Sequence, residues 1–342
     1  MRDGQIVGRT NRNGGLLSIA MYFLLVAVSF LAVGEAEAAT TVQAYGPFTV
    51  TFHNNGDTDG YITGQQDWTA EQMADVGASI QMWSQYIDNT PGRQVAMHAF
   101  WRELDSLGTN VLGGAASYMY SDGGGTTVWA LGEYVWKEGV NPGTTGFGFD
   151  TVIDYDITAA GLAWNFGTDA PGAGQIDFRS VVAHEIGHSL GFVSTYDLDY
   201  DDFGWFGSTF AGLTAWDKGL VDDQGNKPLS GGTGTPDDFN EVDDPVYWDG
   251  LNAVSYYGDS LVPIYAPDPW QQGSSLSHLD EATFPTVLMS PSIAAAQAIR
   301  QPSNLEWMMM KDMGWDIVPE PGTLLLLALG SIGVLLRRRR RR

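Results

Sequence analysis

Alternating apolar and polar positions predict the first strand of the chain. Phe48, Val50 and Phe52 alternate with two threonines, which is the pattern of a strand with one buried face. Short runs rich in β-branched and aromatic residues then predict three more strands. These lie over residues 95–100, 111–120 and 147–155.

Runs with helical spacing accompany these strands. Residues 69–87 place an apolar side chain at every third or fourth position. Thr69 and Gln72 at their start fit a capping box, in which each side chain accepts a hydrogen bond from the other residue's backbone N–H. Residues 293–299 and 304–313 also have helical spacing, which predicts two short helices near the end of the chain.

A further helix is predicted over residues 178–190. Asp177 is suited to cap its start, and Gly191 to stop it. The following residues, 193–273, are rich in Asp, Gly and aromatic side chains, which predicts a loop-rich region. Strands and helices mixed in this order indicate an α+β fold.

The N-terminus has the three parts of a secretory signal peptide. Residues 1–15 carry three Arg, an apolar run follows over residues 16–33, and Ala36-Glu37-Ala38 fits a cleavage site. We expect removal of residues 1–38. An N-terminal membrane anchor is the alternative.

The C-terminus, residues 318–342, resembles the PEP-CTERM sorting signals of Gram-negative bacteria. Pro319-Glu320-Pro321 is followed by a short apolar stretch over residues 323–336 and then by six Arg. The resemblance implies export, transient insertion of this segment in the membrane, and recognition by an exosortase-type enzyme. The protein would then be secreted or held at the cell surface. A plain C-terminal anchor is the alternative.

Charge and cysteine content exclude several classes of function for the remaining residues, 39–317. They carry 8 Lys and Arg against 37 Asp and Glu, a net charge of −29. Nucleic-acid binding is not expected, because phosphates would be repelled. The chain has no Cys, which excludes thiolate metal sites and thiol catalysis.

The predicted helix at residues 178–190 contains the motif H-E-x-x-H. His184 and His188 are four positions apart, so one helix face presents two imidazoles to a single ion. Glu185 is placed to take a proton from a zinc-activated water. Gly187 inside a helix is unfavourable, and close approach of another segment would explain its presence there. We therefore predict a catalytic zinc site.

The residues alone leave the third zinc ligand open. The chain matches the extended motif H-E-x-x-H-x-x-G-x-x-H as far as Gly191. At the position of the last His, however, it has Ser194. Three replacements are considered: a distant His278, an acid just past the helix, or a Glu on a later helix. The acids are Asp197 and Asp199, and the later Glu is Glu306.

The order of motifs resembles that of the leishmanolysin-like metzincins. The resemblance covers the site helix, Ser277-His278 and the segment Leu288-Met289-Ser290-Pro291. In that family an insertion separates the glycine from the third histidine; here 89 residues separate His188 from His278. The resemblance implies that His278 is the third ligand and that Met289 forms a floor beneath the metal.

The resemblance also implies an architecture. A metzincin-like zincin domain would have an upper β/α part, residues 39–191, with the H-E-x-x-H helix, and a loop-rich lower part, residues 192–317, with a Met-turn. The substrate would lie in the cleft between them. This chain departs from the eukaryotic relatives in lacking Cys, and it has Leu279 where an aromatic residue is frequent.

Other residues that could bind a metal are expected to have structural roles instead. His53 ends a predicted strand, and His98 lies among apolar residues. The acidic run at residues 197–202 is a candidate calcium site, although a solvated loop is the simpler interpretation because the spacing is not that of an EF-hand.

The expected function is that of a secreted zinc endopeptidase acting on protein or peptide substrates. Two alternatives stay open. One is a surface or extracellular-matrix protein that binds zinc or calcium without turnover. The other is a metal hydrolase acting on a non-peptide bond. An intact Glu185 favours catalysis, because metal binding alone does not need it.

Overall fold

The computed structural model describes most of the chain between residues 40 and 318. The described ranges are 40–87, 94–104, 110–121, 127–140, 148–197, 202–205, 208–209, 212–227, 245–271 and 273–318. The predicted signal peptide and all of the sorting signal except Val318 lie outside these ranges. What is described is a mixed α+β structure, as predicted.

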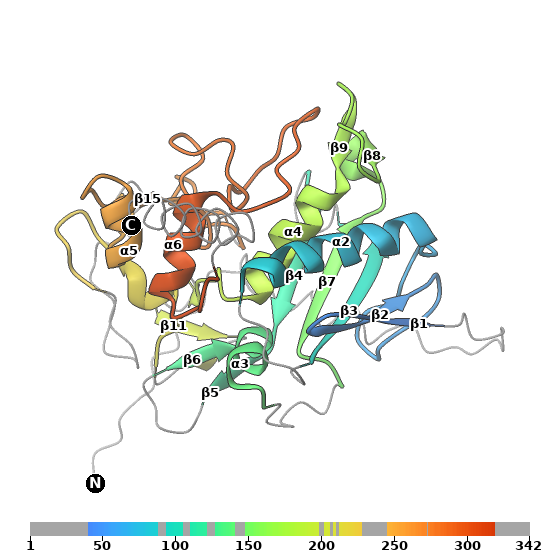
Figure 1. Cartoon of the computed structure of the whole chain (residues 1–342), viewed down its shortest axis with the longest axis horizontal. Helices are drawn as coiled ribbons and strands as arrows, with labels where there is room; N and C mark the ends of the chain where they lie inside the picture. Colours follow the sequence, from blue (N-terminus) through green and yellow to red (C-terminus); the bar gives the residue numbers. More distant parts are fainter. Residues whose placement is uncertain are drawn as a thin grey trace, which may run out of the picture.

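The described molecule has two halves, which precede and follow the end of helix α4 (Phe178–Ser189). A five-stranded sheet lies at the centre of the first half (Figure 1). Its strands, in spatial order, are β1 (Thr41–Tyr45), β2 (Phe48–His53), β3 (Val95–Arg102), β7 (Thr151–Asp156) and β4 (Gly113–Ser117). The pairs β2–β3 and β3–β7 are parallel, whereas β1 and β4 pair antiparallel with their neighbours. Strand β4 is therefore the outermost strand on one side.

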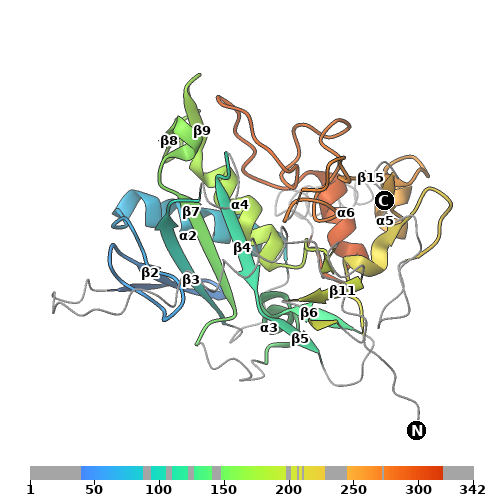
Figure 2. The same cartoon turned by 180° about the vertical axis from the view of Figure 1, so that it is seen from behind.

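Two helices lie against each other on one face of this sheet (Figures 1 and 2). Helix α2 (Ala70–Tyr86) connects β2 to β3 and has the predicted capping box between Thr69 and Gln72. Helix α4 (Phe178–Ser189) carries the H-E-x-x-H motif. The Trp83 indole of α2 donates a hydrogen bond to the Ala183 carbonyl of α4 at 3.0 Å, which fixes one helix against the other.

The core between sheet and helices explains the strand alternation. Phe48, Val50 and Phe52 are fully buried, and they pack in one cluster with Trp83 of α2. Burying each such side chain contributes about 1.5–3 kcal/mol. Phe100 belongs to a smaller cluster of buried side chains, with Ile62, Phe149 and Val152.

Shorter elements complete the two halves. The first half also holds β5 (Met119–Ser121), β6 (Val128–Ala130), α3 (Leu131–Glu138), a 3-10 turn η1 (Ala159–Gly161), β8 (Ala163–Asn165) and β9 (Gln175–Asp177). After α4 come β10 (Tyr196–Asp197), β11 (Asp202–Trp205), β12 (Ser208–Thr209), η2 (Asp217–Gly219), β13 (Leu220–Val221), β14 (Val246–Trp248), α5 (Leu251–Tyr256), β15 (Val262–Ile264) and α6 (Asn304–Asp312). The region predicted as loops thus contains several very short strands and one short helix.

One predicted helix is wrong. Residues 293–299 form no helix, and Ala296 has a positive φ of 63°. Backbone groups there bond to other segments instead: Ala296 N–H donates to Gln175 O at 3.0 Å, and Ile299 N–H donates to Ser180 Oγ at 2.7 Å. These tertiary bonds outweigh the helix propensity of the alanines. The predicted strand at 111–120 is two strands, β4 and β5, that pair with different partners.

Candidate metal centre

Helix α4 has a defined start and a sharp end. The Asp177 carboxylate accepts a hydrogen bond from Ser180 N–H at 3.0 Å, as an N-cap does. At the other end Gly191 has a φ of 105°, which a residue with a Cβ adopts only under strain. The chain then turns back, and Phe192 N–H donates to Gly187 O at 3.2 Å.

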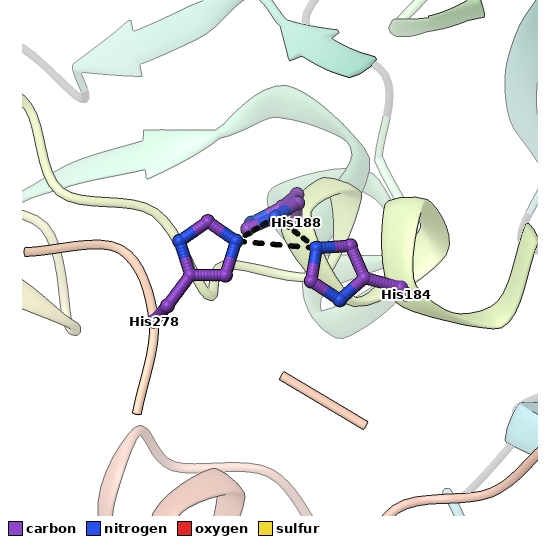
Figure 3. A group of neighbouring side chains, drawn as sticks. All are labelled: His184, His188 and His278. Carbon is purple, nitrogen blue, oxygen red and sulfur yellow. Dashed lines mark hydrogen bonds between the residues drawn. The ribbon is translucent and has the colours of Figure 1, made fainter. Parts of the chain in front are cut away.

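Three imidazoles meet beside α4. His184 and His188 project from one face of the helix, and His278 reaches them from a segment 90 residues further along (Figure 3). Their Nε2 atoms are 3.0 Å apart for His184 and His188, 3.1 Å for His188 and His278, and 3.2 Å for His184 and His278. Among the described residues, this is the one group of three or more potential metal ligands that converges in this way.

Backbone carbonyls fix the tautomer of all three rings. The Nδ1 atoms of His184, His188 and His278 lie 2.7, 2.5 and 2.8 Å from the carbonyl oxygens of Leu288, Phe192 and Ser274. A carbonyl only accepts, so each Nδ1 carries the hydrogen. In the neutral ring each Nε2 is then a bare lone pair, and the three lone pairs face one another.

This arrangement fits a metal ion better than it fits protons. Burial lowers the pKa of all three rings, strongly for His188, whose pKa the neighbouring imidazoles lower further, and to about 3 for His278, next to His184. The rings are thus held neutral, as metal ligands must be. A tetrahedral zinc ion with bonds of about 2.0–2.1 Å would hold ligand nitrogens about 3.4 Å apart, close to the separations seen.

Glu185 is buried beside these histidines. Burial, and after it the negative charge of Asp154, raise the pKa of Glu185 to about 8. A cation at the imidazoles would act in the opposite direction, because it favours the carboxylate. Strand β4 approaches closely: a Cβ added to Gly113 would lie 3.0 Å from Glu185 Oε1. The glycine thus leaves room for the carboxylate between β4 and α4.

Gly187 has the close neighbour that the sequence indicated. A Cβ at this position would lie 2.6 Å from Met289 Sδ, far inside contact distance. Met289 is fully buried. Its thioether therefore packs directly against α4 at Gly187, which lies between the two histidines of the helix. Only a residue without a side chain leaves room for the thioether there.

The turn that contains Met289 is tied to both sides of the site. Leu288 O accepts from His184 Nδ1, and Met289 O accepts from Leu279 N–H, next to His278. Glu306 at the start of α6 holds the turn through Met289 N–H at 2.5 Å. Glu306 is thus not one of the converging side chains, and no sequence pattern pointed to this backbone contact.

The remaining candidates lie elsewhere. His53 Nδ1 is 3.0 Å from Asp57 Oδ2 and its ring stacks on Phe100, away from the three-histidine group. His53 Nε2 lies 3.1 Å from His98 Nδ1. Both therefore have structural contacts. Asp199 and most of the acidic run 197–202 lie outside the described residues, while Asp197 pairs with Asp202 in the short hairpin β10–β11.

Comparison with known proteins identifies the C-terminal segment. Residues 318–341 match the PEP-CTERM protein-sorting motif. The chain therefore carries the sorting signal of an exported, cell-surface protein of Gram-negative bacteria, which an exosortase-type enzyme recognises. Neither the curated proteins nor the solved structures give a match.

The predicted membrane-spanning stretch, residues 323–336, lies outside the described part of the chain. Within the described part, no helix combines the length and apolar character needed to cross a bilayer.

Proposed function

We propose that the protein is an exported zinc-dependent endopeptidase with a metzincin-like catalytic domain. The observation that carries the proposal is the convergence of the His184, His188 and His278 Nε2 lone pairs within 3.2 Å, beside the buried Glu185. Three neutral nitrogen ligands with an acid next to them suit a catalytic zinc, which leaves its fourth position open. A purely structural site has no use for that acid.

The residues divide the chemistry between them. When bound, zinc would polarise the scissile carbonyl and the attacking water. The Glu185 carboxylate takes a proton from that water and delivers it to the leaving amine nitrogen. Met289 is a packed floor under α4 and holds no metal, because its sulfur faces Gly187. Gly191 turns the chain so that Phe192 O orients His188.

Strand β4 offers a surface for an extended peptide. It is the outermost strand of the described sheet and passes next to Glu185 at Gly113. The backbone groups on the free side of such a strand can pair with an added strand. A peptide bound there would run past the carboxylate, as hydrolysis requires. The second half of the molecule, which brings His278, would form the opposite wall.

The test replaces Glu185 with Ala and compares zinc content with hydrolysis of casein or gelatin. We expect the Glu185→Ala variant to keep its zinc and to lose about 10²–10⁴-fold in rate, because the general base is missing. Glu71→Ala, at an exposed position of α2, is the matched control and should keep full activity. Full activity of Glu185→Ala would contradict the mechanism.

The same assay decides the alternatives. A wild-type protein that binds zinc but hydrolyses neither protein substrate, with or without chelator, would overturn the endopeptidase proposal. That result would favour a non-catalytic zinc protein or a hydrolase of another bond. Loss of hydrolysis on adding chelator, with recovery on adding zinc, is the expected outcome.

A further inference from the structure

The segment that carries His278 is not itself a helix or strand, and two backbone hydrogen bonds tie it to Tyr265: Tyr265 N–H donates to His278 O at 2.9 Å, and Leu276 N–H donates to Tyr265 O at 2.8 Å. Residues 273–278 form turns and bends, and Leu276 among them has a positive φ of 63°. That region is unfavourable for a residue with a Cβ and persists only where surrounding contacts determine it. The side-chain contacts on Leu276 and Ser277 add to these bonds in setting where the His278 imidazole lies.

Two of these contacts come from the residues inserted after α4. The Trp216 indole N–H donates to the Leu276 carbonyl at 2.6 Å, and both residues are buried. Ser194 N–H donates to Ser277 Oγ at 3.0 Å. Ser194 occupies the position at which the extended zinc motif has its third histidine. The insertion thus contacts the two residues just before His278.

Trp216 is itself firmly held. Its ring packs against Phe192, with centroids 5.2 Å apart, and against Trp248 at 4.8 Å. The next residue, Asp217, is fully buried and accepts hydrogen bonds from Thr195 N–H at 3.2 Å and Thr195 Oγ1 at 2.8 Å. Such a fixed indole can impose a position on a turn that is strained.

The packing also joins two metal ligands. The Phe192 carbonyl accepts from His188 Nδ1, while the Phe192 ring contacts Trp216. Trp216 then holds Leu276, two positions before His278. One short chain of contacts therefore runs from the ring that orients His188 to the segment that presents His278.

We propose that Trp216 is a positioning residue of the metal centre. Its indole N–H, together with the Ser194–Ser277 hydrogen bond, holds the turn so that His278 Nε2 meets those of His184 and His188. Without the indole N–H, a buried Leu276 carbonyl loses its donor, and the turn relaxes away from its strained conformation. The inference rests on the proposed function, because it concerns the same zinc site.

The test measures zinc affinity of the purified full-length chain by competition with a chelating indicator. Trp216→Phe keeps an aromatic ring and removes the N–H donor; we expect a zinc Kd about tenfold higher, as for other residues that orient metal ligands. Ser277→Ala removes the second contact and should also raise the Kd. The visible spectrum of the Co²⁺-loaded Trp216→Phe variant should shift toward that of His278→Ala.

Trp248→Phe is the matched control. Trp248 is buried in the same aromatic stack, but its indole N–H points to Asp312 at 3.4 Å. This variant should lose stability while keeping the wild-type zinc Kd and Co²⁺ spectrum. Wild-type affinity in a folded Trp216→Phe variant, or an equal rise in Trp248→Phe, would overturn the inference.

The outcomes separate this inference from the proposed function. If Trp216→Phe does not fold, Ser277→Ala decides: a raised Kd supports the inference and an unchanged Kd contradicts it. A wild-type chain without zinc affinity would overturn the proposed function and, with it, the inference. A wild-type chain that binds zinc without hydrolysing protein would overturn only the endopeptidase, and the positioning role of Trp216 would still be measurable.

Discussion

At the scale of single residues, the site depends on one missing side chain. Gly187 lies between the two helix histidines, and the Met289 thioether occupies the space that a Cβ would take, with Sδ at 2.6 Å and Cε at 3.1 Å from it. Glycine inside a helix costs about 1 kcal/mol relative to alanine. The glycine is needed here despite this cost, because any side chain at position 187 would collide with Met289.

We predict that Gly187→Ala changes the sign of its effect with the background. In the wild-type chain the added methyl overpacks against Met289 and should lower the free energy of unfolding by about 1–3 kcal/mol. In a Met289→Ala background the obstacle is gone, and the same change should be neutral or stabilise by up to about 1 kcal/mol. Denaturant unfolding of the four metal-free proteins gives this coupling.

An equal cost of Gly187→Ala in both backgrounds would show that Met289 is not the obstacle. Trp83 is then the next neighbour, since its Cζ2 lies 3.4 Å from the same position. Trp83 makes its own hydrogen bond to Ala183 O.

At the scale of elements, the start of α4 depends on an ion pair between Asp177 and Arg300, which precedes α6. Arg300 donates to Asp177 from Nε at 2.9 Å and also from its terminal nitrogen. Burial alone would raise the pKa of Asp177, but hydrogen bonds from Arg300 and Ser180 outweigh it and hold that pKa below its ordinary value. The irregular segment 293–300 is thereby fastened to the site helix.

This ion pair predicts how stability depends on pH. Because the pKa of Asp177 is depressed in the folded state, the stabilisation is complete at neutral pH and is lost as the pH falls through the folded value. Arg300→Gln should lower the free energy of unfolding at pH 7 by about 2 kcal/mol. The difference from wild type should begin to shrink below about pH 4, where the carboxyl of the unfolded chain takes up a proton before that of the folded chain.

Unfolding of both proteins across pH 3–8 measures this prediction. Lys227→Gln is the control, because Lys227 pairs with Asp249 at the surface and such pairs contribute little. A difference between Arg300→Gln and wild type that is independent of pH would show that Arg300 acts only through its bonds to the Thr168 and Asp169 carbonyls.

Elements with local signals could be predicted from the sequence. The capping box at Thr69, the N-cap at Asp177 and the positive φ at Gly191 each depend on residues a few positions apart. The failed helix at 293–299 depends instead on Gln175 and Ser180, more than a hundred positions away. The alanine-rich sequence of this segment therefore does not reveal that its backbone bonds to distant residues.

The same distinction applies to the candidate site. The spacing of His184 and His188 on one helix face follows from the helical repeat alone. The place of His278 came from the resemblance of its surroundings to a family, because no local rule connects positions 188 and 278. Trp216, which contacts Leu276, was invisible for that reason: a buried tryptophan in a loop-rich region looks like core.

At the scale of the whole molecule, the three histidines of the candidate site join its two halves. His184 and His188 belong to α4, in the half built on the five-stranded sheet, and His278 lies between β15 and α6, in the other half. Figure 2 shows α4 beside the sheet and α6 in the second half. A metal that binds all three stabilises the folded chain, because the unfolded chain does not hold the ligands together. The same ion that would serve catalysis would therefore also serve stability.

We predict that removing the metal lowers the melting temperature. Zinc at about a hundred times its Kd adds about 2.7 kcal/mol to the free energy of unfolding. For a domain of this size that corresponds to about 5 °C. The His98→Ala variant should show the full fall on adding chelator, whereas His278→Ala, which lacks one ligand, should show almost none. Recovery with Zn²⁺ but not with Ca²⁺ assigns the effect to the three-histidine site, and recovery with Ca²⁺ alone would place the stabilising ion among the acidic residues instead.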